Sequence, residues 1–194
     1  MMQNMHVLAA GPLDHLEAAS IDNGAIALHD SSHQARVGFR GRHAAWYLQQ
    51  RGFVLPDQPN QCCWQSDGSL VARLSQTEFL ILAADNAPSR IQHEEQSWQM
   101  NELSCFMLPR QDTHAWLAIN GAQQAAMMAK LCAVDLSSDK FLPGAVAQTS
   151  VARANALIIN ASLPDDEQFW LLVDYSMAAY FWDVLLDAMA EFAR

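Results

Sequence analysis

The segments ARVGFRG (35–41) and HAWLAING (114–121) decide how this chain is built. Each alternates apolar and polar residues, which is typical of a half-buried β-strand, and each ends at a glycine. A shift of 80 residues superimposes the matching positions, which are Ala35, Val37, Phe39 and Gly41 on Ala115, Leu117, Ile119 and Gly121. The pattern therefore predicts an internal duplication.

The tripeptide Val-Ala-Arg extends the repeat, since it occurs at 71–73 and again at 151–153 in the same register. Farther along, TEFLILAA (77–84) matches EQFWLLVD (167–174) at a shift of 90 residues. We therefore expect about ten extra residues around the acidic turn LPDDEQ, because insertions are tolerated in loops. The repeat also predicts that Arg73 and Arg153 hold equivalent strand positions.

Each copy contains a short amphipathic helix and a strongly apolar strand. RHAAWYLQQRG (42–52) and AQQAAMMAKLC (122–132) predict the helices, and FLILAA (79–84) and FWLLV (169–173) predict strands buried on both faces. This order of elements indicates an α+β fold with a duplicated split-βαβ (ferredoxin-like) unit. We expect a single domain over residues 1–194, with repeat halves at approximately 28–100 and 108–193.

Two further segments predict a helix at the end of each half. APSRIQHEEQSWQ (87–99) gives a weak signal, whereas SMAAYFWDVLLDAMAEFA (176–193) gives a strong one with Ser176 as its N-cap. The apolar residues of the second segment follow helical spacing and predict its buried stripe: Met177, Tyr180, Phe181, Val184, Leu185, Ala188, Met189 and Phe192.

Trp182 lies one position off the acidic side of this last helix rather than at the centre of the stripe. Two interpretations stay open. The indole completes the edge of the core, or it contacts a partner protein, since large aromatic side chains are favoured interface anchors. We name Trp182 as a candidate interface residue.

Composition excludes several classes of function. The chain carries 11 Lys plus Arg against 21 Asp plus Glu, a net charge of −10, so it lacks the basic surface that binds nucleic acid or anionic membranes. The sequence shows no signal peptide and no stretch of about 18 apolar residues, and its four cysteines lack disulfide spacing. We expect a soluble, cytoplasmic protein with free thiols.

Few residues suggest chemistry. His29 and His33 stand four apart, but the Asp-Ser-Ser between them predicts a turn rather than a helical metal site. The vicinal pair Cys62-Cys63 could bind a soft metal or act in redox chemistry, but two small apolar strand residues explain it better. The spacing of Cys132 and a histidine such as His114 does not support a nucleophile-base pair, and we expect no catalytic residue and no metal. Asp67, in the Asp-Gly turn before a strand, is the carboxylate best placed to project into a cleft, although turn chemistry alone explains it.

The block LCAVDLSSDKFLPGAVAQTSVARA (131–154), followed by FWLLVDYSMAAYFWDVLLDAMAEF (169–192), resembles the gamma subunit of heterotetrameric sarcosine oxidase. That family typically has a Cys-Pro-Leu-Asp-Leu run, a Phe, a Pro-Gly-Ala, an Ala-Gln-Thr and a Trp in its final helix. The same order stands here as Cys132, Asp135-Leu136, Phe141, Pro143-Gly144-Ala145, Ala147-Gln148-Thr149 and Trp182, with Cys-Ala-Val in place of Cys-Pro-Leu. The first half is similar, more generally, to the folate-binding aminomethyltransferase fold.

This resemblance implies a non-catalytic interaction subunit of a flavoenzyme complex that oxidises sarcosine to glycine, with tetrahydrofolate accepting the one-carbon unit. Its partners would be alpha- and beta-type sarcosine oxidase subunits, which carry the flavins and NAD. The alternative is a stand-alone tetrahydrofolate-binding or aminomethyltransferase-like protein. Aminomethyltransferases carry a folate-contacting Asp in the corresponding hairpin, so the resemblance makes Asp67 a candidate folate contact.

Overall fold

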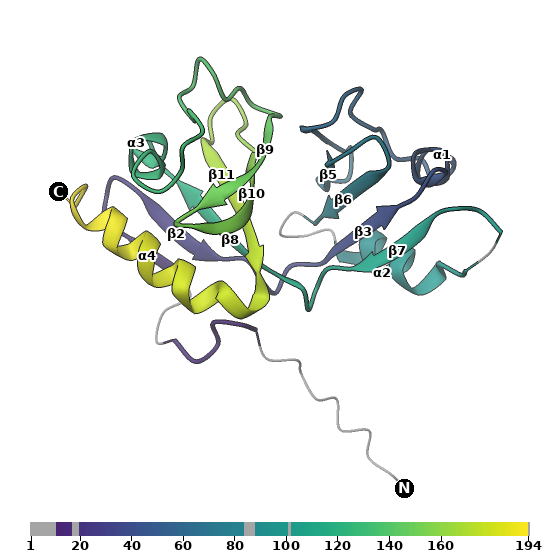
Figure 1. Ribbon diagram of the computed structural model, residues 1–194, viewed down its shortest axis with the longest axis horizontal. Coiled ribbons are helices and arrows are strands. Elements are labelled where there is room, and N and C mark those ends of the chain that lie inside the picture. Colours follow the sequence, from purple (N-terminus) through teal and green to yellow (C-terminus); the bar gives the residue numbers. More distant parts are fainter. Residues whose placement is uncertain (1–10, 17–19, 84–87, 101, 194) are drawn as a thin grey trace, which may run out of the picture.

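The computed structural model describes residues 11–16, 20–83, 88–100 and 102–193, which form two antiparallel β-sheets (Figure 1). The six-stranded sheet has the spatial order β1 (Ser20–Asp22), β2 (Ala27–Asp30), β8 (His114–Asn120), β11 (Gln168–Asp174), β10 (Ala154–Asn160), β9 (Val146–Val151). The five-stranded sheet has the order β4 (Gln61–Trp64), β5 (Leu70–Arg73), β6 (Glu78–Leu82), β3 (Arg36–Arg40), β7 (Phe106–Pro109).

Helices cover the outer face of each sheet, which confirms the α+β class. The five-stranded sheet carries α1 (Ala44–Gln50) and α2 (Pro88–Ser97), while the six-stranded sheet carries α3 (Gln124–Met128) and the long α4 (Ala178–Ala190). A single 3₁₀ turn, η1 (Tyr175–Met177), leads into α4. Asp174, rather than the expected Ser176, caps this turn, because its carboxylate accepts the Ser176 backbone N–H.

The duplication is visible in the strand order, because β4-β5-β6-β3 of one sheet repeats as β9-β10-β11-β8 in the other. The strand that precedes each copy is exchanged. β2 precedes β3 in the chain but pairs with β8, and β7 precedes β8 but pairs with β3. Each sheet therefore contains a strand that belongs, in sequence, to the other half, and the two halves are interlocked.

Arg36 holds the two exchanged connections together. Its guanidinium is 1% exposed and donates to the backbone carbonyls of Ser32 and Gln34 on one connection. It also donates to three carbonyls on the other connection, those of Arg110, Gln111 and His114. Burial lowers the pKa of Arg36 to about 10, so the group is still a cation at neutral pH. One buried charge thus satisfies five backbone acceptors where the connections meet.

The glycine that ends each repeat strand is required by close backbone approach. Gly41 and Gly121 have φ of 144° and 123°. A Cβ at Gly41 would lie 2.2 Å from the carbonyl oxygen of Ser104, and one at Gly121 would lie 2.4 Å from that of Ala25. Both contacts are with the segment just before an exchanged strand, so the two glycines perform the same function in the two copies.

The prediction that Arg73 and Arg153 hold equivalent strand positions is wrong. Val71 lies opposite Ile81 in the first copy, whereas Leu171, the counterpart of Ile81, lies opposite Ile158 rather than Val151. Ala152 and Arg153 instead form the turn between β9 and β10, with φ of 47° and 68°. The extra residues of the second copy are spread over several loops, so the shift of 80 no longer holds at this point.

A short symmetric seam joins the edges of the two sheets. The Cys62 N–H donates to the Gly144 carbonyl at 2.7 Å, and the Val146 N–H donates to the Asn60 carbonyl at 3.0 Å. Asn60 and Gly144 both have positive φ, 61° and 88°. The two strand edges, β4 and β9, therefore meet in a reciprocal way that reflects the duplication.

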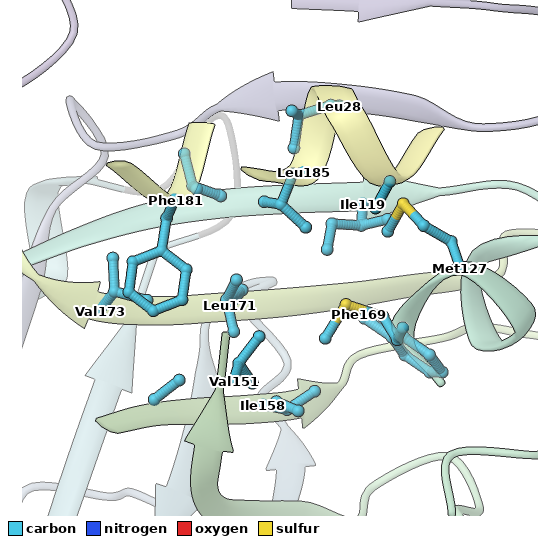
Figure 2. Close-up of a cluster of buried hydrophobic side chains, with 14 of the residues drawn as sticks. Leu28, Ile119, Met127, Val151, Ile158, Phe169, Leu171, Val173, Phe181 and Leu185 are labelled. Carbon is cyan, nitrogen blue, oxygen red and sulfur yellow. The ribbon is translucent and has the colours of Figure 1, made fainter. Parts of the chain in front are cut away.

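The core consists of three clusters of buried side chains. Two lie under the helices, and Figure 2 shows the larger one, where Phe181 and Leu185 of α4 point toward Leu171 and Val173 of the six-stranded sheet. The third cluster lies between the two sheets. Its strand residues alternate with those of the helix-covered clusters, so both faces of the central strands are buried. The prediction that β3 and β8 are half-buried is therefore wrong, because the second sheet covers the face away from the helices.

Candidate functional site

The space between the two sheets is filled by apolar side chains at its centre and opens into a cleft on either side. We call the first the tryptophan cleft, with a volume of about 800 Å³. Its lining residues are His29, Asp30, Ser31, Gln34, Trp64, Gly68, Trp116, Ala118, Asn120, Leu163, Asp166, Gln168 and Trp170. This volume lies within the range of pockets for small organic ligands.

Three tryptophans from different strands form one wall of the tryptophan cleft. Trp170 on β11 lies between Trp64 on β4 and Trp116 on β8, with ring-centroid distances of 5.3 Å and 4.6 Å and edge-to-face geometry. Trp170 is held by its indole N–H, which donates to the Gln168 side chain at 2.7 Å. These contacts hold the three rings in place. Trp116 and Trp170 are only 1% and 5% exposed, so the half-buried Trp64 is the ring against which a planar ligand can stack.

Two acidic side chains stand out among the polar groups of this cleft. Asp30 and Asp166 contribute carboxylates, and neither lysine nor arginine occurs among the described residues of the lining. Asp166 is positioned by the side chains of Asn120 at 3.4 Å and Gln168 at 3.1 Å. An aromatic wall beside two carboxylates favours a flat ring that carries N–H donors.

Trp116 adds a further observation to the tryptophan cleft. The residue is 1% exposed, and its indole N–H has no acceptor among the residues that the structure describes. Burying such a donor without a partner costs about 1–3 kcal/mol. Unpartnered buried donors are uncommon in folded proteins and often mark a site with a second role.

Asp67 lies in the turn between β4 and β5, directly before Gly68, which lines the tryptophan cleft. Both of its carboxylate oxygens are engaged: Oδ1 accepts from the backbone and hydroxyl of Ser69, and Oδ2 pairs with Arg90 at 3.0 Å. Burial raises the pKa of Asp67, but the Ser69 hydrogen bonds and Arg90 outweigh it, so the pKa is lowered. Asp67 is therefore next to the cleft, and its side chain is turned toward α2.

Trp182 is placed in the core rather than on the surface. Its side chain is 3% exposed and belongs to the cluster beneath α4. Of the two interpretations of this residue, burial supports the edge of the core, because so buried a side chain offers a partner almost no contact area. Tyr180, expected in the buried stripe, is 42% exposed, since α4 is rotated to bring Trp182 inward.

The thiols and histidines raised by the sequence do not form a reactive group. Burial raises the pKa of Cys62 to about 12 and that of Cys105 to about 11, so both are protonated at neutral pH. His29 contacts Ser20, and His33 contacts Asp14. Within the described ranges, no group of three or more His, Cys, Asp or Glu residues is placed to hold a metal ion.

Cys132 and His114 are not brought together. Cys132 is buried in the cluster under the helices, whereas His114 lines the second cleft, on the opposite face of the six-stranded sheet.

Among the residues that the structure describes, none of the helices has both the length and the apolar character of a membrane span.

The sequence analysis missed the three tryptophans of the cleft, because they come from separate strands of both halves. A signal was available in β8, where Ala115, Leu117 and Ile119 alternate with Trp116 and Ala118. A strand buried on both faces needs a second covering layer, and a tryptophan on the face away from the helices points to that layer. The strand pairing that brings the three tryptophans together could not be predicted from the sequence.

Comparisons with known proteins agree on the fold. The search of curated proteins found no match. A chain of the heterotetrameric sarcosine oxidase from Corynebacterium sp. U-96 is similar in structure, with a TM-score of 0.78 and 23% identity over 96% of this chain and 97% of that chain. The predicted likeness to a sarcosine oxidase chain is thereby confirmed at the level of the fold.

A second solved structure, the glycine cleavage system aminomethyltransferase T from Bartonella henselae, matches with a TM-score of 0.59 and 19% identity. The match covers 82% of this chain but 45% of that protein. The family model of the GCVT N-terminal domain matches residues 60–193, which is more than half of the sequence. This chain belongs to the family of GCVT N-terminal domains.

Proposed function

We propose that this chain is a non-catalytic subunit of a cytoplasmic sarcosine oxidase-type complex and packs on alpha- and beta-type subunits, which carry the flavins and NAD. The observation that carries the proposal is the end-to-end match with one chain of a heterotetrameric sarcosine oxidase, covering 96% of this chain and 97% of that one. The aminomethyltransferase, by contrast, is about twice as long as the matched region.

The chemistry of the described residues supports a non-catalytic role. Asp135 and Asp174 have lowered pKa values because their carboxylates accept hydrogen bonds from the serines two residues later, Ser137 and Ser176. The thiols of Cys62 and Cys105 are protonated at neutral pH. These groups stabilise turns and fill space rather than providing a base or a nucleophile.

Co-expression tests the subunit proposal. The chain should co-purify with alpha- and beta-type subunits from its own source, elute with them in one flavin-containing peak, and show a fixed stoichiometry by light scattering. Sarcosine-dependent oxygen consumption should be present in that peak and absent from the isolated chain. A monodisperse monomer that binds neither subunit would refute the proposal.

As an alternative function we propose that the tryptophan cleft binds the pterin ring of tetrahydrofolate, in a stand-alone aminomethyltransferase-like protein or within the complex. The observation that favours it is the half-buried Trp64 beside Asp30 and Asp166, since the pyrimidinone ring of the pterin is flat and presents N–H donors. Asp67 would contact folate only after its ion pair with Arg90 opens.

Calorimetry under anaerobic conditions tests folate binding. Trp64→Leu should weaken tetrahydrofolate binding about tenfold, because one ring–aromatic stack contributes about 1–3 kcal/mol. Asp67→Asn tests the proposed contact, with Asp135→Asn as its control, since Asp135 makes the same pair of hydrogen bonds with Ser137 outside the cleft. Absence of heat at millimolar tetrahydrofolate would eliminate this alternative and leave the subunit proposal standing.

A further inference from the structure

The second cleft, which we call the His114 cleft, lies on the other side of the inter-sheet core and has a volume of about 730 Å³. The duplication relates it to the tryptophan cleft, because Glu78 and Leu80 of β6 hold the places that Gln168 and Trp170 hold in β11. The aromatic wall is replaced by aliphatic side chains. The larger aliphatic residues of its lining include Leu80, Leu157, Leu172 and Met177.

Two polar side chains of this cleft stand side by side. His114 on β8 and Asp174 on β11 are directly opposite each other in the antiparallel ladder, which places their Cβ atoms about 5 Å apart on one face. Both residues line the cleft. Any ligand group that reaches one of them is therefore within reach of the other.

His114 Nδ1 lies 2.8 Å from the Thr113 hydroxyl oxygen, which is also 3.3 Å from the Pro109 carbonyl oxygen. With the proton on Nδ1 and donated to the Thr113 oxygen, Nε2 is left as an acceptor. A ligand that donates to Nε2 requires this tautomer. Burial, followed by Arg110 and Arg36, lowers the pKa of His114 to about 4, so the ring is neutral at pH 7.

Asp174 supplies a second free acceptor. Its Oδ1 accepts from the Ser176 backbone at 2.9 Å and from the Ser176 hydroxyl at 2.5 Å. Neither Asp174 Oδ2 nor His114 Nε2 has a hydrogen-bond partner within the described ranges of the chain. The hydrogen bonds from Ser176 lower the pKa of Asp174, which keeps its carboxylate ionised.

One carboxylate of the lining lies in no ion pair of the described chain. Arg110 of the lining is paired with Glu78 at 2.7 Å, and Arg36, whose charge also lowers the pKa of His114, donates to five backbone carbonyls, whereas Asp174 is in no ion pair with any described residue. This carboxylate and the net charge of −10 on the whole chain both favour a cation. Two acceptors, one negative charge and an aliphatic wall specify the chemistry of the occupant.

We propose that the His114 cleft binds a small organic ammonium ion, whose N–H groups donate to Asp174 Oδ2 and His114 Nε2 while its alkyl groups lie against Leu157, Leu172 and Met177. The ammonium group can belong to a simple alkylamine or to an amino-acid zwitterion. The cleft differs from the tryptophan cleft in position and in ligand class. The proposal is independent of the subunit and folate proposals.

An NMR titration of the full chain tests the site. Isobutylammonium chloride is the probe, leucine tests the zwitterion, and isobutanol, which has the same alkyl group without the charge, is the control. We expect saturable shifts of the His114 ring resonances with one or both amines and none with isobutanol. Long-range ¹H–¹⁵N spectra should show the free chain with the proton on Nδ1.

Two matched variants separate the site from a general effect of charge. Asp174→Asn should weaken amine binding about tenfold or more, whereas Asp135→Asn, which alters the same serine motif outside the cleft, should leave it unchanged. His114→Gln should also weaken binding, and near-native thermal unfolding of each variant shows that it is folded. The proposal is overturned if 100 mM amine leaves the His114 signals unmoved, if isobutanol binds as well, or if the two Asp variants behave alike.

Discussion

Replacing Arg36 with methionine should strongly destabilise the fold. Methionine fills a similar volume with an unbranched apolar chain, but it removes a buried cation that donates to five backbone carbonyls. Those carbonyls lie on the two connections that exchange β2 and β7 between the sheets. The substitution therefore weakens the point at which the halves are interlocked.

The expected loss in the free energy of unfolding is about 3–5 kcal/mol, because several buried carbonyls lose a donor and each unsatisfied acceptor costs about 1–3 kcal/mol. Five hydrogen bonds from a charged donor would sum to more than this. Some of the acceptors regain partners, however: Ser32 O already accepts from the Gln111 side chain, and water reaches the others as the connections relax. For a chain of this size, the loss corresponds to a drop in Tm of about 10 °C.

Urea unfolding followed by tryptophan fluorescence measures this loss, since the chain has six tryptophans. Arg40→Met is the matched control: Arg40 is on the same strand, but its side chain is 66% exposed and lies 3.8 Å from Glu78. The control should lose less than about 1 kcal/mol. If the free energy of unfolding of Arg36→Met lies within about 1 kcal/mol of the wild-type value, the two connections do not depend on this residue and the prediction is refuted.

Three further predictions follow from the structure. Gly41→Ala should lose more than about 2 kcal/mol in the free energy of unfolding, measured thermally, because its Cβ would lie 2.2 Å from a backbone oxygen. The control Gly24→Ala, which has φ of 82° and open space, should lose about 1 kcal/mol, and equal losses would contradict the close approach at Gly41. Trp182→Ala should lower the free energy of unfolding of the isolated chain by about 3–5 kcal/mol, against less than about 1 kcal/mol for Tyr180→Ala at an exposed position. An unchanged Tm for Trp182→Ala would restore the interface interpretation. Because the pKa of His114 is lowered from 6.5 to about 4 in the folded chain, its contribution to stability is complete above pH 6.5 and is lost as the pH falls toward 4. The urea midpoint of His114→Gln should therefore change less with pH over that range than the wild-type midpoint, and identical pH profiles would refute this prediction.

Much of the local structure could be predicted from sequence. Alternation predicted β3 and β8, and the closing glycines predicted the turns at Gly41 and Gly121, whose positive φ the structure bears out. Helical spacing predicted α4 and the burial of Phe181 and Leu185. These signals were reliable because each depends on the period of a single element and on which of its faces is buried.

Two predictions failed within the last helical segment, the burial of Tyr180 and the cap at Ser176, and another failed because it depended on counting residues across loops. The second Val-Ala-Arg was matched to a strand and lies in a turn, because insertions spread over several loops change the shift without altering the strands. The candidate site was missed for a related reason. Its tryptophans come from β4 of one sheet and from β8 and β11 of the other. Which strands lie together depends on the pairing between the two halves.

The sequence by itself determined the class of fold, its duplication and the main helix, because hydrophobic periodicity and glycine conformations act within a few residues. Only the tertiary structure decided which strands pair across the halves, that Asp67 is tied to Arg90, that Trp182 is buried, and that His114 faces Asp174. These are contacts between residues far apart in the chain. They are fixed by packing the two sheets against each other, and no local pattern records them.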